Sequence, residues 1–104
     1  MSRAVSLRPA AQADIRAVVA HYRADSGLGI ALNFTDQLQR LLVAMLVGTE
    51  PGARWPGEAI DLPGLRAWRV PRFPHLVLAL ERPDRFDVIR VLHGKRDLPT
   101  GFGS

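Results

Sequence analysis

Cysteine is absent from the 104-residue sequence, and lysine and tyrosine each occur once, as Lys95 and Tyr22. The lack of cysteine excludes disulfides, thiol nucleophiles and thiolate metal sites, and it suits a reducing compartment. Long apolar runs are also missing, because the longest covers only residues 41–47, whereas a membrane-spanning helix needs roughly 20 residues. The first residues show no apolar signal segment and no cleavage site. We therefore expect a cytoplasmic protein that makes no use of a membrane.

Metal and cofactor motifs are lacking as well. The histidines His21, His75 and His93 are scattered, and no pair sits four residues apart beside a carboxylate. No glycine-rich phosphate loop follows a predicted strand. The sequence therefore predicts neither a metal site nor a cofactor.

The overall composition is that of an ordinary folded domain. Hydrophobic residues make up 47% of the chain and charged residues 23%. The length predicts one domain over residues 1–104, with residues 99–104 as a frayed tail. A domain of this size has a modest stability margin, so a partner is expected to contribute to its stability.

The charge balance is mildly basic. Fourteen Lys plus Arg against ten Asp plus Glu give a net charge of +4, and all but one of these cations are arginine. Such an excess is compatible with a polyanionic partner, and it is equally what a codon bias towards arginine produces. Direct contact with nucleic acid is therefore allowed but not required.

The periodicity of apolar residues predicts a strand, two helices and then three strands. Residues 3–7 read as a short strand, and Pro9 suits the first turn of a helix that ends at Gly27. A second helix runs from about Gly29 to Gly48 after a connection so short that the two helices form an antiparallel hairpin. Residues 49–64, rich in proline and glycine, read as a connecting loop.

Three strands follow, over residues 65–70, 75–81 and 86–93, and their short connections require antiparallel pairing. The fold class is therefore α+β: a short N-terminal strand and a two-helix hairpin packed on a twisted, mainly antiparallel sheet of about four strands. Strict alternation in the last strand predicts two faces, one with Phe86, Val88, Arg90 and Leu92 and the other with Asp87, Ile89, Val91 and His93. A lone histidine on that second face is most simply a hydrogen-bonded residue at a strand end.

Several short motifs follow one another between residues 7 and 98. They are Asp14-Ile15, Tyr22, Ala31, Phe34 and Leu38 in the helices, then Gly64-Leu65-Arg66, Phe73-Pro74-His75-Leu76-Val77 and Ile89-Arg90-Val91-Leu92-His93-Gly94-Lys95-Arg96-Asp97. In order and spacing the chain resembles the ParE branch of the RelE/ParE toxin superfamily. The resemblance implies the toxin of a type II toxin–antitoxin system, neutralised by a cognate ParD-like antitoxin, with roles in plasmid stabilisation or stress response. It implies DNA gyrase as the target in the ParE branch, and ribosome-dependent mRNA cleavage in the RelE branch; a shared fold cannot choose between them.

The residues can be tested against the ribonuclease alternative. Cleavage through the ribose 2′-OH needs a base or orienting group, a cation over the phosphate and an acid for the leaving oxygen, for which Arg66, His93 and Arg96 are the candidates. The single lysine, and a tyrosine located only in the first helix, leave this inventory sparse. We therefore favour a toxin that acts by binding rather than catalysis. An inactive, toxin-like interaction module remains a third hypothesis.

Two binding surfaces are predicted. The target-binding surface comprises Arg90, His93, Lys95 and Arg96, because loops held at sheet ends often carry function. Arg96 has an equally simple alternative role as an ion-pair partner of Asp97. An amphipathic antitoxin helix is expected in a groove beside the helical hairpin. The residues assigned to that groove and its surroundings are Tyr22, Leu28, Phe34, Leu38 and Trp55, whereas Trp68 is expected to face the core.

Overall fold

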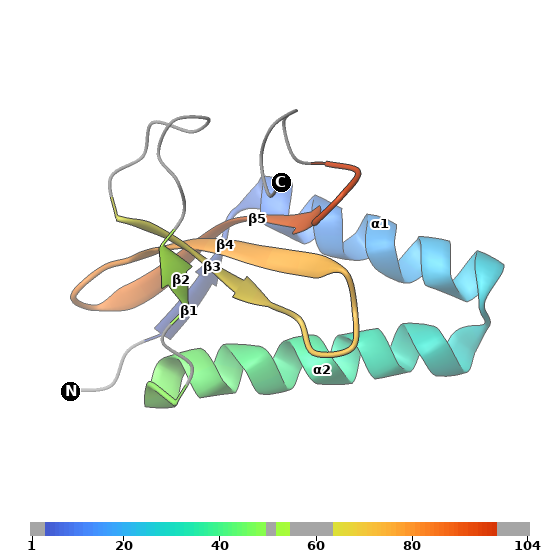
Figure 1. Cartoon of the computed structure of the whole chain (residues 1–104), viewed down its shortest axis with the longest axis horizontal. Coiled ribbons are helices and arrows are strands. Elements are labelled where there is room, and N and C mark those ends of the chain that lie inside the picture. Colours follow the sequence, from blue (N-terminus) through green and yellow to red (C-terminus); the bar gives the residue numbers. More distant parts are fainter. Residues whose placement is uncertain (1–3, 50–51, 55–63, 98–104) are drawn as a thin grey trace.

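The computed structural model describes residues 4–49, 52–54 and 64–97 (Figure 1). Its elements in chain order are β1 (Ala4–Leu7), α1 (Pro9–Asp25), α2 (Leu28–Val47), β2 (Ala53–Arg54), β3 (Leu65–Arg69), β4 (His75–Glu81) and β5 (Arg85–His93). The two long helices form a hairpin beside a twisted sheet, which confirms the predicted α+β class. The proposed tail over residues 99–104 and most of the loop over residues 49–64 lie outside the described residues.

The sheet has the strand order β1-β5-β4-β3-β2. The pairs β2–β3, β3–β4 and β4–β5 are antiparallel, and β1 runs parallel to β5. The short strand β2 corrects the prediction for residues 49–64, because Ala53 and Arg54 pair with Ala67 and Arg66 inside the segment expected to be an irregular loop. A strand of two residues at a sheet edge is too short to leave an alternating pattern, so the surrounding proline and glycine residues dominated that segment.

Glycines set the ends of the helical hairpin. After α1, the Ser26 N–H donates to the Tyr22 carbonyl, and Gly27 takes a positive φ of 93°. At the end of α2, Gly48 adopts the left-handed conformation, with its N–H bonded to the carbonyls of Ala44 and Met45. A residue without a Cβ adopts this conformation at little cost, and it satisfies carbonyls that the helix leaves open. The tight connection therefore fixes the helices as an antiparallel pair.

The main core lies between the helical hairpin and the sheet. Its fully or nearly buried members are Ala11, Phe34, Leu38, Leu41, Met45, Trp68, Val70, Phe73, Val77, Ala79, Phe86, Val88 and Val91. A second buried cluster, on the alternate positions of the strands, consists of Leu65, Ala67, Leu78, Leu80, Ile89 and Leu92. Trp68 is only 3% exposed, which confirms that it faces the core. The backbone of Gly52 packs on its indole so closely that a Cβ there would lie 2.5 Å from Trp68 Cε2.

A β-bulge in β5 overturns the predicted faces of that strand. Leu78 pairs with Arg90 and the next residue, Ala79, pairs with Val88, so Ile89 is an extra residue without a partner. Beyond the bulge the alternation is shifted by one position. Val91 therefore joins Phe86 and Val88 in the main core, whereas Leu92 and Ile89 share the second cluster.

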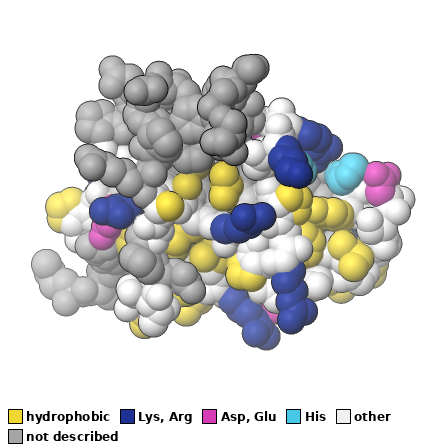
Figure 2. Space-filling model, in the orientation of Figure 1, with side chains coloured by type: hydrophobic (Ala, Val, Ile, Leu, Met, Phe, Trp, Pro, Cys, Tyr) yellow, Lys and Arg dark blue, Asp and Glu magenta, His cyan; other side chains and the backbone are white. Residues whose placement is uncertain are grey.

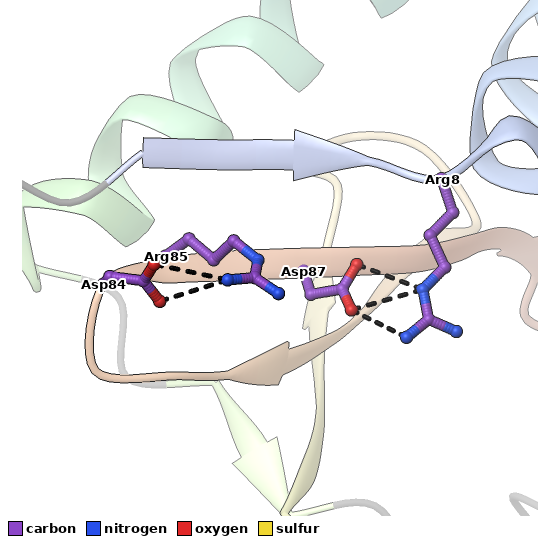
Figure 3. A network of polar contacts seen from close by, with 4 residues as sticks. All are labelled: Arg8, Asp84, Arg85 and Asp87. Carbon is purple, nitrogen blue, oxygen red and sulfur yellow. Dashed lines mark hydrogen bonds and ion pairs between the residues drawn. The ribbon is translucent and has the colours of Figure 1, made fainter.

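An ion pair fastens the junction of β1 and α1 to β5 (Figure 3). The Arg8 guanidinium donates to the carboxylate of Asp87, with Nη2 2.7 Å from Oδ2, and the Arg8 N–H donates to the Val88 carbonyl. Hydrogen bonding from Arg8 lowers the pKa of Asp87 below its ordinary value, despite the opposing effect of burial. A second, exposed ion pair lies nearby, between Asp84 in the turn before β5 and Arg85 at the start of β5. The chain therefore enters α1 at a fixed position on β5.

Candidate functional site

A cleft of about 650 Å³ lies between α1 and the C-terminal end of β5. Ionisable side chains from three parts of the chain line it: Asp14 and His21 from α1, His75 from β4, and Arg90, Arg96 and Asp97 from the end of β5 and the following turn. This is the end of the sheet at which the sequence predicted the target-binding surface. Asp14, His75, Arg90 and Asp97 each have a defined partner or environment.

Asp14 completes the hydrogen bonding of β5 where β1 has already ended. The Val91 N–H donates to Asp14 Oδ2 (2.9 Å), and the Arg90 guanidinium donates to both carboxylate oxygens (2.7 and 2.9 Å). The pairing of β1 with β5 ends at Leu7 and Val88, so on this side of β5 the Val91 N–H donates to a carboxylate from the helix instead of to a strand. Its hydrogen bonds raise the pKa of Arg90, so this arginine is fully charged. Asp14 and Arg90 thus join α1 to the cleft wall.

His93 organises the turn over residues 94–97. Its Nδ1 accepts the backbone N–H groups of both Lys95 and Arg96, each at 3.1 Å. The Asp97 carboxylate accepts the His93 N–H (2.8 Å), and the Asp97 N–H returns to the His93 carbonyl. Desolvation, followed by the nearby Arg96 charge, lowers the pKa of His93, which favours the neutral ring that these bonds require. The turn is therefore held from both sides.

Gly94 brings this turn against the start of β4. Its N–H donates to the Pro74 carbonyl at 2.7 Å, and a Cβ at this position would lie 3.0 Å from the same oxygen. A glycine allows the backbone to approach this closely without displacing the neighbouring chain. The start of β4 and the end of β5 are consequently joined beside the cleft.

His75 lies at the inner wall of the cleft, 2% exposed, among aromatic rings. Its ring centroid is 5.2 Å from that of Phe34, 5.9 Å from that of Tyr22 and 5.3 Å from that of His93. Burial, and then the charges of His93 and Arg96, lower the pKa of His75 to about 4. Its Nδ1 is buried and has no hydrogen-bond partner among the described residues. The ring is therefore neutral near pH 7 and belongs to the core that supports the cleft.

The structure brings the predicted target-binding residues to one end of the sheet. Lys95 and Arg96 are exposed on the turn, whereas His93 supports that turn and Arg90 is paired with Asp14. Figure 2 shows basic side chains gathered over the end of β5, beside a histidine and an acidic side chain on the α1 side. Asp97 binds the His93 backbone N–H rather than the Arg96 side chain, so the alternative of an Arg96–Asp97 ion pair is not realised.

The three residues considered for RNA cleavage do not converge. Arg66 lies on β3, where its Nε is 3.7 Å from the Glu81 carboxylate, and it pairs across the sheet with Ala79, which in turn faces Val88. His93 lies five positions further along β5, which corresponds to a separation of roughly 15 Å along that strand. Arg66 and the turn bearing Arg96 are therefore at opposite ends of the sheet. A single catalytic centre containing Arg66, His93 and Arg96 is not formed.

The predicted antitoxin-binding residues fall in different environments. Phe34 and Leu38 are buried in the main core, Tyr22 is half-buried and Leu28 is 55% exposed. The prediction that the antitoxin packs directly on Phe34 and Leu38 is therefore corrected, because the helical stripe that carries them faces the sheet. Trp55 lies outside the described residues. An apolar groove of about 730 Å³ does exist between α1 and α2, lined by Ile15, Arg16, Val19, Ala20, Arg23, Ala24 and Thr35.

Sequence reasoning missed the parts played by Asp14, His75 and Asp97. Asp14 and His75 stood within the motifs of the family resemblance, but no local pattern identified their partners. Among the residues that the structure describes, no group of three His, Asp or Glu side chains is placed to hold a metal ion. None of the helices in the same part of the chain is both long and apolar enough to cross a membrane.

Comparison with known proteins identifies the family. The model of the family described as "ParE toxin of type II toxin-antitoxin system, parDE" matches residues 5–98. The chain therefore belongs to the ParE toxin family of type II toxin–antitoxin systems.

Among solved structures, the fold is similar to a chain of the chromosomal ParDE toxin–antitoxin system from P. aeruginosa, with a TM-score of 0.71 and 21% sequence identity. That match covers 88% of this chain and 96% of the other. No curated protein matches the sequence.

Proposed function

We propose that this toxin acts in the cytoplasm by binding and poisoning DNA gyrase, without a catalytic step of its own. The observation that carries the proposal is the turn after β5, which presents Lys95 and Arg96 to solvent on a backbone held by His93 and Asp97. A rigid basic turn loses little conformational freedom on binding, which favours recognition of an acidic partner surface. Membership of the ParE family supports gyrase as that partner.

The chemistry of the cleft supports binding over RNA cleavage. The Nδ1 of His93 is occupied by two backbone N–H groups, and His75 is buried with its pKa lowered to about 4. A general base or acid must reach the reacting proton and titrate near the working pH. His75 meets neither requirement, the Nδ1 of His93 is not free to take a proton while it holds the turn, and Arg66 is at the far end of the sheet.

The neutralising partner is proposed to be a ParD-like antitoxin whose amphipathic helix occupies the groove between α1 and α2. Ile15, Val19, Ala20 and Ala24 supply an apolar floor, and Arg16 and Arg23 stand at its sides. Apolar side chains of a helix fit such a floor, while acidic residues beside them would meet the two arginines. The solved ParDE structure with a similar fold supports a partner of this kind.

The groove is tested by co-purifying the toxin with the product of the neighbouring gene. Arg16→Glu with Arg23→Glu should weaken the complex at least tenfold while leaving the toxin folded. Arg69→Glu with Arg82→Glu changes the net charge equally at exposed residues away from the groove, and should bind normally. Equal affinity of both double variants would place the antitoxin elsewhere.

The target is tested by controlled expression of the toxin with and without its antitoxin, followed by parallel assays of DNA supercoiling and mRNA integrity. Loss of supercoiling with intact mRNA is the expected result. Ribosome-dependent mRNA cuts would support the ribonuclease hypothesis instead. Normal growth, supercoiling and mRNA on expression without the antitoxin, of a chain that folds and is able to bind the antitoxin, would indicate an inactive interaction module.

A further inference from the structure

The middle of the turn over residues 94–97 is held by a single atom. The N–H groups of Lys95 and Arg96 both donate to Nδ1 of His93, each at 3.1 Å. Neither N–H donates to a carbonyl in the part of the chain that the structure describes. The first and last residues of the turn are held differently, because their N–H groups donate to backbone carbonyls. The imidazole of His93 therefore orders the two residues that carry the exposed basic side chains.

The same nitrogen of His93 must take up any further proton. An imidazole accepts a hydrogen bond only through a nitrogen that carries no proton. Because Nδ1 is the acceptor, the neutral ring carries its proton on Nε2. A second proton can therefore bind only at Nδ1. Protonation turns this acceptor into a donor that faces two backbone N–H groups, and both hydrogen bonds are lost.

The charges on the turn add to this effect. Besides desolvation, the charges of Arg96 and Lys95 lower the pKa of His93, whereas the Asp97 carboxylate raises it. A protonated His93 therefore lies beside two cations and one carboxylate. Like charges repel the ring from the position in which it holds the turn, and the carboxylate offers it a partner elsewhere.

Two other histidines lie near His93, on β4 and on α1. The ring of His75 faces that of His93 with 5.3 Å between centroids, but it is only 2% exposed, whereas His93 is half-buried. Charging a fully buried ring is more costly, so His93 takes up a proton before His75 as the pH falls. His21 lines the same cleft from α1, and its Nε2 lies 3.5 Å from the carboxylate of Asp25 on its own helix.

We propose that His93 is a proton-operated latch: the neutral ring holds Lys95 and Arg96 in the conformation that binds the target, and protonation releases the turn. The consequence for target binding rests on the proposed function. Only the latched chains are competent to bind, so the apparent dissociation constant rises about tenfold when about nine tenths of the chains are released. The groove between α1 and α2 is lined by no histidine or carboxylate, and binding of the antitoxin there is independent of the latch.

Backbone ¹⁵N relaxation of the purified full-length chain tests the latch without any target. At neutral pH the amides of Lys95 and Arg96 should be rigid, with order parameters of about 0.85. About one pH unit below the midpoint of the His93 titration, followed by its ring C–H signals, these values should fall below about 0.6. Order parameters that stay high while the ring titrates would overturn the proposal.

Two substitutions of His93 separate its charge from its role as an acceptor. His93→Asn supplies a side-chain oxygen that accepts N–H groups further along the backbone and does not titrate, so the turn should stay rigid at both pH values. His93→Ala removes the acceptor, and the turn should be mobile at both. The same loss of order at low pH in His93→Asn as in the wild type would overturn the proposal.

Binding to purified gyrase under the same two conditions tests the consequence for the target. The wild-type affinity should decrease about tenfold at the lower pH, while that of His93→Asn changes little and that of His93→Ala is low at both. Antitoxin binding by all three chains serves as the control for folding. Equal pH dependence in the wild type and His93→Asn would contradict the latch. A chain whose turn is released on protonation but which binds no gyrase at any pH would support the latch and refute the proposed target.

Discussion

The imidazole rings of His75 and His93 face each other across the pair of strands β4 and β5, with their centroids 5.3 Å apart and the rings nearly perpendicular. The contact depends on the bulge at Ile89, because an uninterrupted register from the hairpin would place Leu92 opposite His75. One histidine completes the aromatic part of the core, and the other holds the basic turn. The position of the proposed target surface therefore follows from one extra residue in β5.

Both histidines make the stability of the fold depend on pH. Their pKa values lie below the ordinary 6.5 in the folded chain, that of His75 at about 4. Between pH 6.5 and about pH 4 the unfolded chain binds more protons than the folded chain. The free energy of unfolding therefore decreases as the pH falls through this range, and these groups do not affect it at higher pH. A loss of the order of 2 kcal/mol is expected from pH 7 to pH 4.5. Urea unfolding at several pH values measures it.

The control for this pH dependence is His75→Gln. It should lower stability near neutral pH but reduce the slope between pH 7 and pH 4.5, because the main titrating group is gone. Asp87 acts only at lower pH, since Arg8 holds the pKa of Asp87 below its ordinary value of 3.8. An unchanged slope in the variant would show that the buried imidazole is not the source.

Asp14 is expected to be needed for stability rather than for contact with a target. Asp14→Ala removes the acceptor of the Val91 N–H and the partner of Arg90, and should lower the free energy of unfolding by about 1–3 kcal/mol. Asp36→Ala removes an exposed carboxylate that pairs within one helix, and should cost less than about 0.5 kcal/mol. Similar losses in the two variants, measured by urea unfolding of the monomer, would contradict the assigned role.

Gly52 is expected to be more sensitive than other glycines with positive φ. Gly52→Ala combines the strain of a φ of 72° with overlap against the Trp68 indole, whereas Gly64→Ala, at a φ of 84°, meets nothing within 4 Å. The second variant should cost about 1 kcal/mol. The first should cost about 1–3 kcal/mol more, because the core must shift to accommodate the new methyl group. Thermal unfolding distinguishes them, and equal midpoints would mean that the indole moves freely.

Lys95→Glu with Arg96→Glu should abolish toxicity without unfolding the chain. Both side chains are exposed, and exposed substitutions away from special features usually change stability by less than about 0.5 kcal/mol. The backbone N–H groups that bind His93 remain in the variant. Survival of cells expressing this variant is compared with that of cells expressing Arg69→Glu with Arg82→Glu, which should stay toxic. A toxic, folded Lys95/Arg96 variant would move the target surface elsewhere.

The sequence predicted the elements of the fold because each carries a local signal. Apolar stripes defined both helices, Pro9 and Gly48 marked their ends, and runs of branched residues defined β3 to β5. The strand β2 was missed because two residues cannot show alternation. The faces of β5 were predicted wrongly beyond Ile89, because a bulge is a property of strand pairing and not of one strand alone.

The candidate site was only partly predictable for the same reason. Grouping Lys95 and Arg96 with Arg90 and His93 followed from their closeness in sequence, and the structure brings them together. The roles of Asp14 and His75 depend on contacts with residues 77 and 18 positions away, which no local pattern encodes. Phe34 and Leu38 showed an apolar stripe, but the stripe alone did not reveal whether the sheet or a partner covers it.

The most direct test of gyrase poisoning adds the purified toxin to purified gyrase, relaxed plasmid and ATP. We expect loss of supercoiling and an increase in DNA cleaved by trapped gyrase. Both effects should disappear with Lys95→Glu/Arg96→Glu and on adding a stoichiometric amount of antitoxin. Unimpaired supercoiling, together with ribosome-dependent cleavage of mRNA by the same preparation, would contradict it.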